Sequence, residues 1–319
     1  MLTKDEVDIL LTAATHAPSM HNTQPWRFEV HEPVVDVLLD KERTLDVADP
    51  AGRAARIGIG AAAFNIRVAA AVLGYKSRLV ADPDPARPDV VARLFLGGRK
   101  TPVPGLGRMY GAVSQRHTYR GPLLDQPIPA RVRDRLDEAA RIEGAQLHWL
   151  GPWATSRLAE LLRQTDTADL ADEDRLHERL RWIGGDRSGD GVQDSALGPA
   201  PARPAVVRDL SLGFESPHRG QAVYETQPAI AILSTRAEDA VGWVHAGAAL
   251  QRVLLTATSY DLTASFVNQV LERPETRIQV RELICGRYWP QMVIRIGYPA
   301  QPAGHTSRLD WHDSFDQWF

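Results

Sequence analysis

The sequence is nearly free of cysteine and has no large excess of charge of either sign, and both absences exclude classes of protein. Cys285 is the single cysteine among 319 residues, which excludes a disulfide framework and a cysteine-rich metal site. With 37 Lys and Arg against 40 Asp and Glu, the net charge is −3, whereas a dedicated nucleic-acid-binding domain is strongly basic. We therefore expect no nucleic-acid partner, and we interpret Cys285 as a small buried apolar residue.

A membrane-spanning run and a secretion signal are also missing. No apolar run approaches the roughly 18–20 residues that a membrane span needs. The sequence starts with MLTKDEVDILL, which has acidic residues where a secretion signal would be basic and then apolar. We therefore predict a cytoplasmic protein that has no membrane partner. Hydrophobic residues make up 44% of the chain, which is ordinary for a globular protein with a packed core.

Common catalytic and metal-binding motifs are absent as well. No histidine pair has the spacing of zinc ligands, and residues 186–194 lack the spacing of a calcium loop, so we expect no metal ion. A nucleophile elbow and a Walker A motif are both missing. Residues 57–64, IGIGAAAF, fit a Gly-x-Gly-x-x-Ala dinucleotide fingerprint, but a helix start precedes them where the fingerprint needs a strand. We interpret these small residues as a surface for close helix packing.

One order of elements occurs twice along the chain. It consists of a helix, a strand with a tryptophan, a long helix that contains Gly-Ala-Ala, and a strand that ends in glycine. We predict its first copy at residues 3–16, 26–30, 53–73 and 93–96, with a hairpin partner strand at 34–40. The second copy lies around residues 132–139, 149, 247–249 and 294–297. Thr3 and Glu6 have the spacing of a capping box at the start of the first helix.

We interpret this order as a duplicated fold, with chance matches between Ala- and Leu-rich helices as the alternative. Residues 97–107, rich in glycine and proline, are the predicted linker between halves at 1–107 and 108–319. The second half is longer, by an insertion at about residues 155–220. Residues 158–182 are predicted to be helical, whereas residues 184–220 are irregular and rich in glycine and proline. Such a long irregular segment is either disordered or a functional lid, and we call residues 184–220 the lid.

Two polar segments have residue types that suit a bound cofactor. The first is APSMHNTQPW, residues 17–26, where Asn22 and Gln24 offer donors and acceptors that match the edge of a planar heteroaromatic ring. A plain helix-to-strand turn is the alternative. The second is SQRHTYRGP, residues 114–122, where Arg116 and Arg120 flank a hydroxyl and suit phosphate oxygens. The alternative is that both arginines are solvated.

These segments resemble parts of the nitroreductase fold. APSMHNTQPW is similar to the loop that reaches across a nitroreductase dimer to the flavin, and RHTYR followed by PIPARVRDRLDEAA is similar to the opening arm and first helix. The ending IGYPAQPAGHTSRLDW resembles the closing strand and phosphate-binding tail. Over nearly the whole chain, the arrangement resembles the Acg-type family, in which two nitroreductase-like halves are fused and carry a lid. The resemblance implies an α+β fold with two pseudo-symmetric halves, each an antiparallel-rich sheet flanked by helices.

The resemblance also implies FMN at the junction of the halves. The arm, RHTYR, would hold the phosphate and the ribityl group, together with one arginine of the tail. The loop APSMHNTQPW would approach the flavin from the other half, and backbone amides would lie near the central ring. The implied residues are Arg116, His117, Thr118 and Arg120 of the arm, Pro18, Ser19, Met20, Asn22 and Gln24 of the loop, Thr263, Ala264 and Ser265 near the ring, and Arg308 of the tail.

The distribution of these parts predicts one FMN per chain. No arginine-rich arm precedes the first helix, and the loop position of the second half reads RIEGAQLHW, without the Asn-x-Gln-Pro motif. One site therefore keeps both parts and the other has lost both. By resemblance, the expected activity is hydride transfer from NAD(P)H to a nitroaromatic or a quinone, and no catalytic side chain is identified. The alternatives are an FMN-storage or FMN-sequestering protein without turnover, and a scaffold without flavin.

Overall fold

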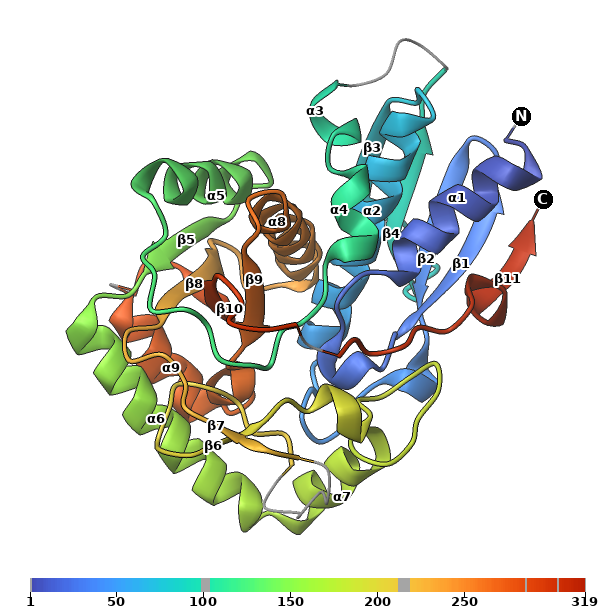
Figure 1. The fold of residues 1–319 in the computed structure, drawn as a ribbon. Helices are drawn as coiled ribbons and strands as arrows, with labels where there is room; N and C mark the ends of the chain where they lie inside the picture. The colour runs from blue at the N-terminus through green and yellow to red at the C-terminus, as the bar shows by residue number, and fades with distance from the viewer. Residues whose placement is uncertain (1, 99–103, 212–218, 285, 303, 319) are drawn as a thin grey trace.

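The computed structural model describes residues 2–98, 104–211, 219–284, 286–302 and 304–318, and within these it contains two sheets that are each covered by helices (Figure 1). The first sheet has the strand order β11-β1-β2-β4-β3. Its strands are β1 (Trp26–His31), β2 (Val34–Leu39), β3 (Ser77–Ala81), β4 (Val90–Leu96) and β11 (Phe315–Trp318). All neighbours are antiparallel except β11, which runs parallel to β1. The end of the chain therefore returns to the sheet that its beginning forms.

The second sheet is antiparallel and has the strand order β5-β8-β10-β9. Its strands are β5 (Gln146–Trp149), β8 (Ala229–Thr235), β9 (Thr263–Phe266) and β10 (Trp289–Gly297). If the strands of each sheet are numbered along the chain, β5, β8, β9 and β10 correspond to β1, β2, β3 and β4. Both sets then have the same order across the sheet, first-second-fourth-third. With its helices and antiparallel sheets the fold is α+β, as predicted.

The helices predicted at 3–16 and 53–73 begin and end within one residue of the observed ones, and helices are also present around 132–139 and 247–249. The helices at 104–107, 110–115 and 274–283 were not predicted. Those of the first sheet are α1 (Lys4–Thr15), α2 (Arg53–Val72), α3 (Pro104–Gly107) and α4 (Tyr110–Gln115). Those of the second are α5 (Ala130–Ile142), α6 (Pro152–Leu170), α7 (Glu173–Trp182), α8 (Ala240–Thr258) and α9 (Pro274–Leu283). The predicted capping box is present, because the Thr3 hydroxyl accepts from the Glu6 amide and the Glu6 carboxylate accepts from the Thr3 amide.

Three local expectations need correction. The helix predicted over 158–182 is interrupted, because Asp172 ends one helix and caps the next by accepting from the Arg175 amide. The predicted linker is helical at α3, and its residues 99–103 lie outside the described part, as does Cys285. The lid contains the short strand β6 (Ala200–Pro201), which pairs with β7 (Gln221–Ala222), and its residues 212–218 are not described.

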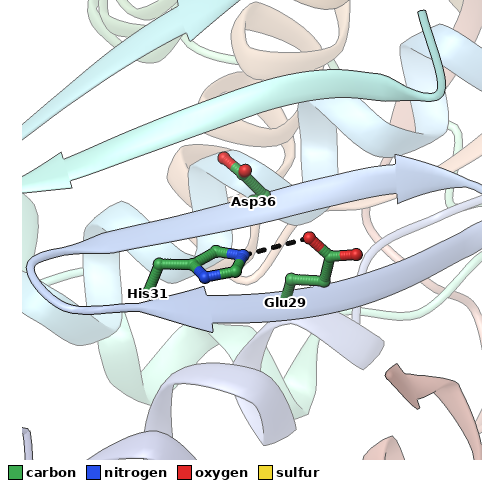
Figure 2. A group of neighbouring side chains, drawn as sticks. All are labelled: Glu29, His31 and Asp36. Carbon is green, nitrogen blue, oxygen red and sulfur yellow. Dashed lines mark hydrogen bonds and ion pairs between the residues drawn. The ribbon is translucent and has the colours of Figure 1, made fainter. Parts of the chain in front are cut away.

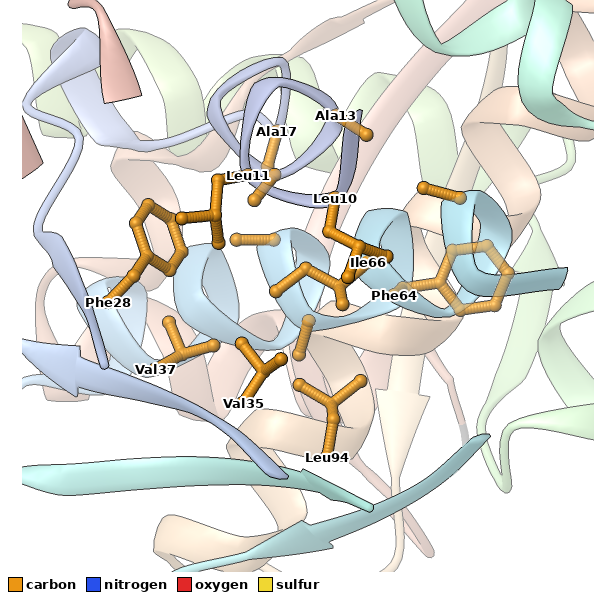
Figure 3. Close-up of a cluster of buried hydrophobic side chains, with 14 of the residues drawn as sticks. Leu10, Leu11, Ala13, Ala17, Phe28, Val35, Val37, Phe64, Ile66 and Leu94 are labelled. Atoms are coloured by element: carbon orange, nitrogen blue, oxygen red, sulfur yellow. The ribbon is translucent and has the colours of Figure 1, made fainter. Parts of the chain in front are cut away.

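The core of the first sheet forms between α1, α2 and the strands. Leu10 and Leu11 of α1 and Ile66 of α2 pack toward Val35 and Val37 of β2 (Figure 3). Helix α2 is long and apolar enough to span a membrane by length and composition, contrary to the expectation that no such run exists. However, 83% of its most apolar 18-residue stretch is buried inside the protein. Its apolar surface is therefore used for packing.

Helices α2 and α8 cross at two glycines. A Cβ built on Gly60 would lie 2.1 Å from the Val244 carbonyl oxygen, and one built on Gly247 would lie 2.0 Å from the Ile57 carbonyl oxygen. Ile57 lies three positions before Gly60, and Val244 lies three positions before Gly247. The contact is therefore reciprocal, as at a two-fold axis. Gly58 and Gly60 of IGIGAAAF both lie inside α2. Gly60 serves the close helix packing that the sequence predicts, whereas Gly58 faces Pro18 and Ser19 of the 17–26 loop.

Candidate functional site

A pocket of about 940 Å³, including open solvent at its mouth, lies between the two sheets. Residues from the 17–26 loop, the start of α2, the 116–120 arm, the lid and the second sheet line it. The polar and loop residues among them are Pro18, Ser19, Met20, His21, Arg53, Thr118, Arg120, Arg208, Ser265, Asn268, Glu272 and Arg295. Six predicted site residues are therefore brought together: Pro18, Ser19, Met20, Thr118, Arg120 and Ser265.

The 17–26 loop has a strained backbone beside this pocket. His21, Asn22 and Gln24 have φ values of 50°, 58° and 53°, in the left-handed region that residues other than glycine rarely adopt. The Ser19 hydroxyl accepts from the Gln24 amide at 2.9 Å and closes the turn. Backbone strain of this kind is often concentrated at functional sites, where surrounding contacts hold it in place.

The carboxamides of this loop contact protein rather than the pocket. Asn22 Nδ2 donates to the carbonyl oxygens of Gly191 at 3.0 Å and Ser307 at 2.9 Å. Gln24 Nε2 donates to the Gly189 carbonyl at 2.8 Å, and its Oε1 accepts from the Leu309 amide at 3.1 Å. Both side chains therefore join the lid to the tail, and neither is among the residues that line the pocket.

The 116–120 arm lies along β9. Thr118 forms a parallel bridge with Ala264, and the Tyr119 amide donates to the Ala264 carbonyl at 2.8 Å. This pairing places Thr118 beside Ser265 in the pocket wall, whereas Thr263 and Ala264 are in β9 but do not line the pocket. His117 points elsewhere, since its ring packs against that of His305 with centroids 3.9 Å apart.

Three arginines form a cationic cluster next to the pocket, of which Arg116 is buried and Arg120 and Arg308 are half-buried. Arg116 Nη2 donates to the His16 carbonyl at 2.7 Å, Arg120 Nη1 donates to the Ala196 carbonyl at 3.1 Å, and Arg308 Nη1 donates to oxygens of its own tail. Within the described residues none of the three pairs with a carboxylate. The Nε atoms of Arg116 and Arg308 are buried and have no hydrogen-bond partner there.

The electrostatics of this cluster are unfavourable without an anion. Burial, followed by the charge of Arg308, lowers the pKa of Arg116 to about 9. Burial, with Arg308 and Arg208 nearby, lowers the pKa of Arg120 to about 10, and burial lowers that of Arg308 to about 10. Buried like charges with unused donors are the arrangement that a phosphate dianion stabilises, through forked and charge-assisted hydrogen bonds.

The lid contributes to the pocket directly. Val207, Arg208 and Leu210 line it, which no local signal in the sequence indicates. Leu210 belongs to a small apolar cluster with Val192 of the lid and Leu45 of the first sheet's half of the chain. The described part of the lid is thus packed onto the protein by its own core. His21, Arg53 and Glu272 also line the pocket and were missed, although His21 lies inside the loop motif.

One further group has the composition of a metal site. Glu29, His31 and Asp36 approach one another on β1 and β2, with His31 Nε2 3.1 Å from Glu29 Oε2 (Figure 2). Both carboxylates are already engaged by arginines. Arg93 holds Asp36 through two hydrogen bonds of 2.7 and 2.6 Å, and Arg87 holds Glu29 through two of 3.0 and 3.1 Å. We interpret the group as ion pairs that tie neighbouring strands together.

Comparisons with known proteins point to one family. The model of the Nitroreductase family matches residues 113–298. "Putative NAD(P)H nitroreductase acg" of Mycobacterium tuberculosis is 27% identical over 299 residues, which cover 93% of this chain and 90% of that protein. "Putative NAD(P)H nitroreductase Rv3131" of the same organism is 29% identical over 316 residues, covering 96% of this chain and 90% of that protein. A crystal structure of a nitroreductase with bound FMN from Bacteroides fragilis matches 62% of this chain and 91% of its own, at 17% identity and a TM-score of 0.40.

Proposed function

We propose a function from one premise: this chain belongs to the nitroreductase family and, within it, to the Acg type. It is a nitroreductase-like oxidoreductase. We propose that it binds one FMN in the pocket between the two sheets, takes hydride from NAD(P)H, and reduces a small nitroaromatic or quinone. FMN supplies the redox chemistry in such a site, and the protein supplies binding, orientation and electrostatics.

The cationic cluster is the observation that carries this proposal. Arg116 is buried, Arg120 and Arg308 are half-buried, and none of them has a carboxylate partner among the described residues. The charge of Arg308 adds to the effect of burial in lowering the pKa of Arg116 and of Arg120. The phosphate of FMN would supply the missing negative charge. Arg120 also lines the pocket, so a phosphate at the cluster would lie next to the pocket in which we place the rest of FMN.

The remaining predicted residues have different roles in this proposal. Thr118 and Ser265 would contact the ribityl group and the ring from the second sheet, and residues 18–20 would contact the ring from the first. Asn22 and Gln24 act indirectly, because their carboxamides hold the lid and the tail in place. Thr263 and Ala264 act through the backbone of β9, which orients the arm.

We propose that residues 1–107 and 108–319 correspond to two fused nitroreductase-like halves, with an insertion at about 155–220. The equal strand order of the two sheets and the reciprocal crossing at Gly60 and Gly247 support this division. The loop comes from the first half and the arm from the second, and each is present once in the sequence. This is the basis for one FMN per chain rather than two.

A second candidate function is storage or sequestration of FMN without turnover. It is favoured by one observation, that Val207, Arg208 and Leu210 of the lid line the pocket. A side chain that covers the exposed face of the flavin would exclude the nicotinamide ring. The lid therefore decides between the two functions.

Rapid mixing of the purified protein with NADPH tests the proposal. Bleaching of the bound flavin within the turnover time of typical enzymes supports the oxidoreductase, and re-oxidation by a quinone completes the cycle. A yellow protein that does not bleach supports storage. A colourless protein that takes up no added FMN contradicts both and leaves a flavin-free scaffold.

A further inference from the structure

Arg208 of the lid has one edge of its guanidinium group without a partner. Its Nη1 pairs with Glu272 Oε1 at 2.6 Å. Its Nε and Nη2 are buried and have no hydrogen-bond partner among the described residues, and the side chain is 9% exposed and lines the pocket. Nε and Nη2 lie on the same side of the planar group, where two parallel N–H bonds match the two oxygens of a carboxylate.

The charges that line the pocket leave it positive on this side. Four arginines line it, but Arg295 is already paired with Glu225. Arg53, Arg120 and Arg208 therefore face a single lining carboxylate, Glu272. Glu272 does not neutralise Arg208 alone, because Arg175 also pairs with it at 3.3 Å. Arg53 donates to backbone carbonyls, that of Gln291 at 2.8 Å among them, and has no ion pair in the described chain. A neutral ligand would leave this excess charge buried, whereas an anion would offset it.

His21 adds a second unused polar atom to the same wall. It is 6% exposed, and its Nε2 has no hydrogen-bond partner among the described residues. Burial, followed by the charges of Arg208, Arg179 and Arg120, lowers the pKa of His21 well below its usual value, which favours the neutral ring. A neutral imidazole beside a guanidinium edge can donate to, or accept from, a group bound there.

We infer that the Nε–Nη2 edge of Arg208 binds the carboxylate of a small planar electron acceptor, so that this pocket prefers aromatic acids that carry a reducible group. The inference rests on the proposed function, in which this pocket receives the acceptor. It assigns the acceptor's anionic group to the lid, whereas the phosphate would be bound by the neighbouring Arg116–Arg120–Arg308 cluster. Arg208 is in this view a specificity residue, since it binds the acceptor and takes no part in the electron transfer.

Two probes that differ mainly in charge test the inference. We would titrate the full-length protein with 4-nitrobenzoate and with 4-nitrobenzamide by calorimetry, after measuring its flavin content separately. The wild type should bind the acid at least about tenfold more tightly than the amide, as expected for a buried forked ion pair. Arg208→Gln should abolish this preference while the affinity for the amide and the flavin content stay close to those of the wild type. Arg203→Gln, at an exposed arginine of the lid, is the matched control and should retain the preference.

Several outcomes would overturn the inference. A wild type without a preference for the acid, or an Arg208→Gln variant that keeps it, contradicts the assignment. If Arg208→Gln binds neither FMN nor either probe, Arg208 instead contacts the flavin or holds the lid closed. If Arg208→Gln does not fold, Arg208→Lys retains the charge beside Glu272 but lacks the fork, and an undiminished preference there would also overturn the two-point contact. A protein without FMN refutes the proposed function, and the calorimetric preference is measured independently of it.

Discussion

In the proposed function, Arg116 serves both the fold and the cofactor. It donates to the His16 carbonyl at the end of α1, and its Nε has no partner among the described residues. We predict that Arg116→Ala weakens FMN binding by about 2–5 kcal/mol, the usual cost of removing one partner of a buried charged hydrogen bond. Fluorescence titration of FMN measures this, with Arg116→Lys as an intermediate that keeps the charge without the fork. Unchanged affinity in the alanine variant would refute the phosphate assignment.

His21 makes stability depend on pH. Burial, followed by the charges of Arg208, Arg179 and Arg120, lowers its pKa well below 6.5 in the folded state. As pH falls below that value, the unfolded chain binds a proton that the folded chain does not, so stability is lost on acidification.

We predict that His21→Asn reduces this loss between pH 6.5 and pH 5 by up to about 1.4 kcal/mol per pH unit, the value for one proton. Asparagine tolerates the left-handed φ of this position. Denaturant unfolding at several pH values measures the slope, and the exposed His177→Asn variant on α7 is the control. Equal slopes in His21→Asn and the wild type would show that His21 is not held neutral.

At the residue scale, the sequence identifies side chains more readily than it identifies their partners. Arg116 and Arg120 stand in one short motif with a hydroxyl between them, which is sufficient to predict an anion site. Asn22 and Gln24 are recognisable in the same way, but their partners at Gly189, Gly191 and the tail lie far away in the sequence, so their contacts with the lid could not be foreseen. Arg208 stands in an irregular segment without periodicity, and only the folded chain brings it to the pocket.

The crossing of α2 and α8 depends on glycine at two positions. A Cβ on Gly60 would approach the Val244 carbonyl oxygen to 2.1 Å, and a backbone oxygen cannot move aside as a flexible side chain can. We predict that Gly60→Ala destabilises the protein by at least about 3 kcal/mol, at the upper end of overpacking costs. Gly111→Ala in α4 has open space around it and should instead stabilise by about 0.5–1 kcal/mol. Thermal unfolding of both variants measures the contrast, and a Gly60→Ala variant as stable as the wild type would show that the helices do not approach so closely.

The lid is held by the carboxamides of the 17–26 loop, which gives a way to loosen it without deleting it. We predict that the double variant Asn22→Ala, Gln24→Ala increases proteolysis within residues 184–211 and accelerates bleaching of retained flavin by NADPH, on the order of tenfold if the lid gates access. Gln193→Ala removes a weaker and exposed lid-to-tail contact and serves as the control. Faster proteolysis with unchanged bleaching would leave the lid a packing element only.

Elements with strong local signals are the ones that the sequence predicts well. The capping box of α1 and the alternation of buried and half-buried residues in β1 depend on neighbours in sequence. Helix α1 and strands β1 and β2 all begin within a residue of their predicted positions. Strand β3 is only half-buried and lacks a clear period, so it was missed. Strand β11 was missed because its partner β1 is almost the whole chain away.

The whole molecule carries the loop and the arm once each on one polypeptide, and our prediction for the number of flavins follows from this. We predict a ratio of one FMN per chain, measured as released flavin against protein concentration. The apparent affinity for FMN should also stay constant when the protein is diluted about a hundredfold, because no second chain is needed to complete the site. A ratio near two would mean that the other arrangement of arm and loop also binds flavin.

The reciprocal crossing of α2 and α8 has a consequence for how the two helices can evolve. In a symmetric homodimer every substitution appears on both sides of the axis, so equivalent contacts stay identical. Here the pair Asn65 and Gln251 joins two amides, with Gln251 Nε2 donating to Asn65 Oδ1 at 2.8 Å. Gly247 follows Gly60 by 187 positions, and the same spacing relates Asn65 to Arg252 and Phe64 to Gln251. The equivalent pair is therefore Arg252 and Phe64, which make a cation–π contact at 5.0 Å. Equivalent positions around the axis therefore make different contacts, because the two positions of each pair are encoded separately in a single chain and can be substituted independently.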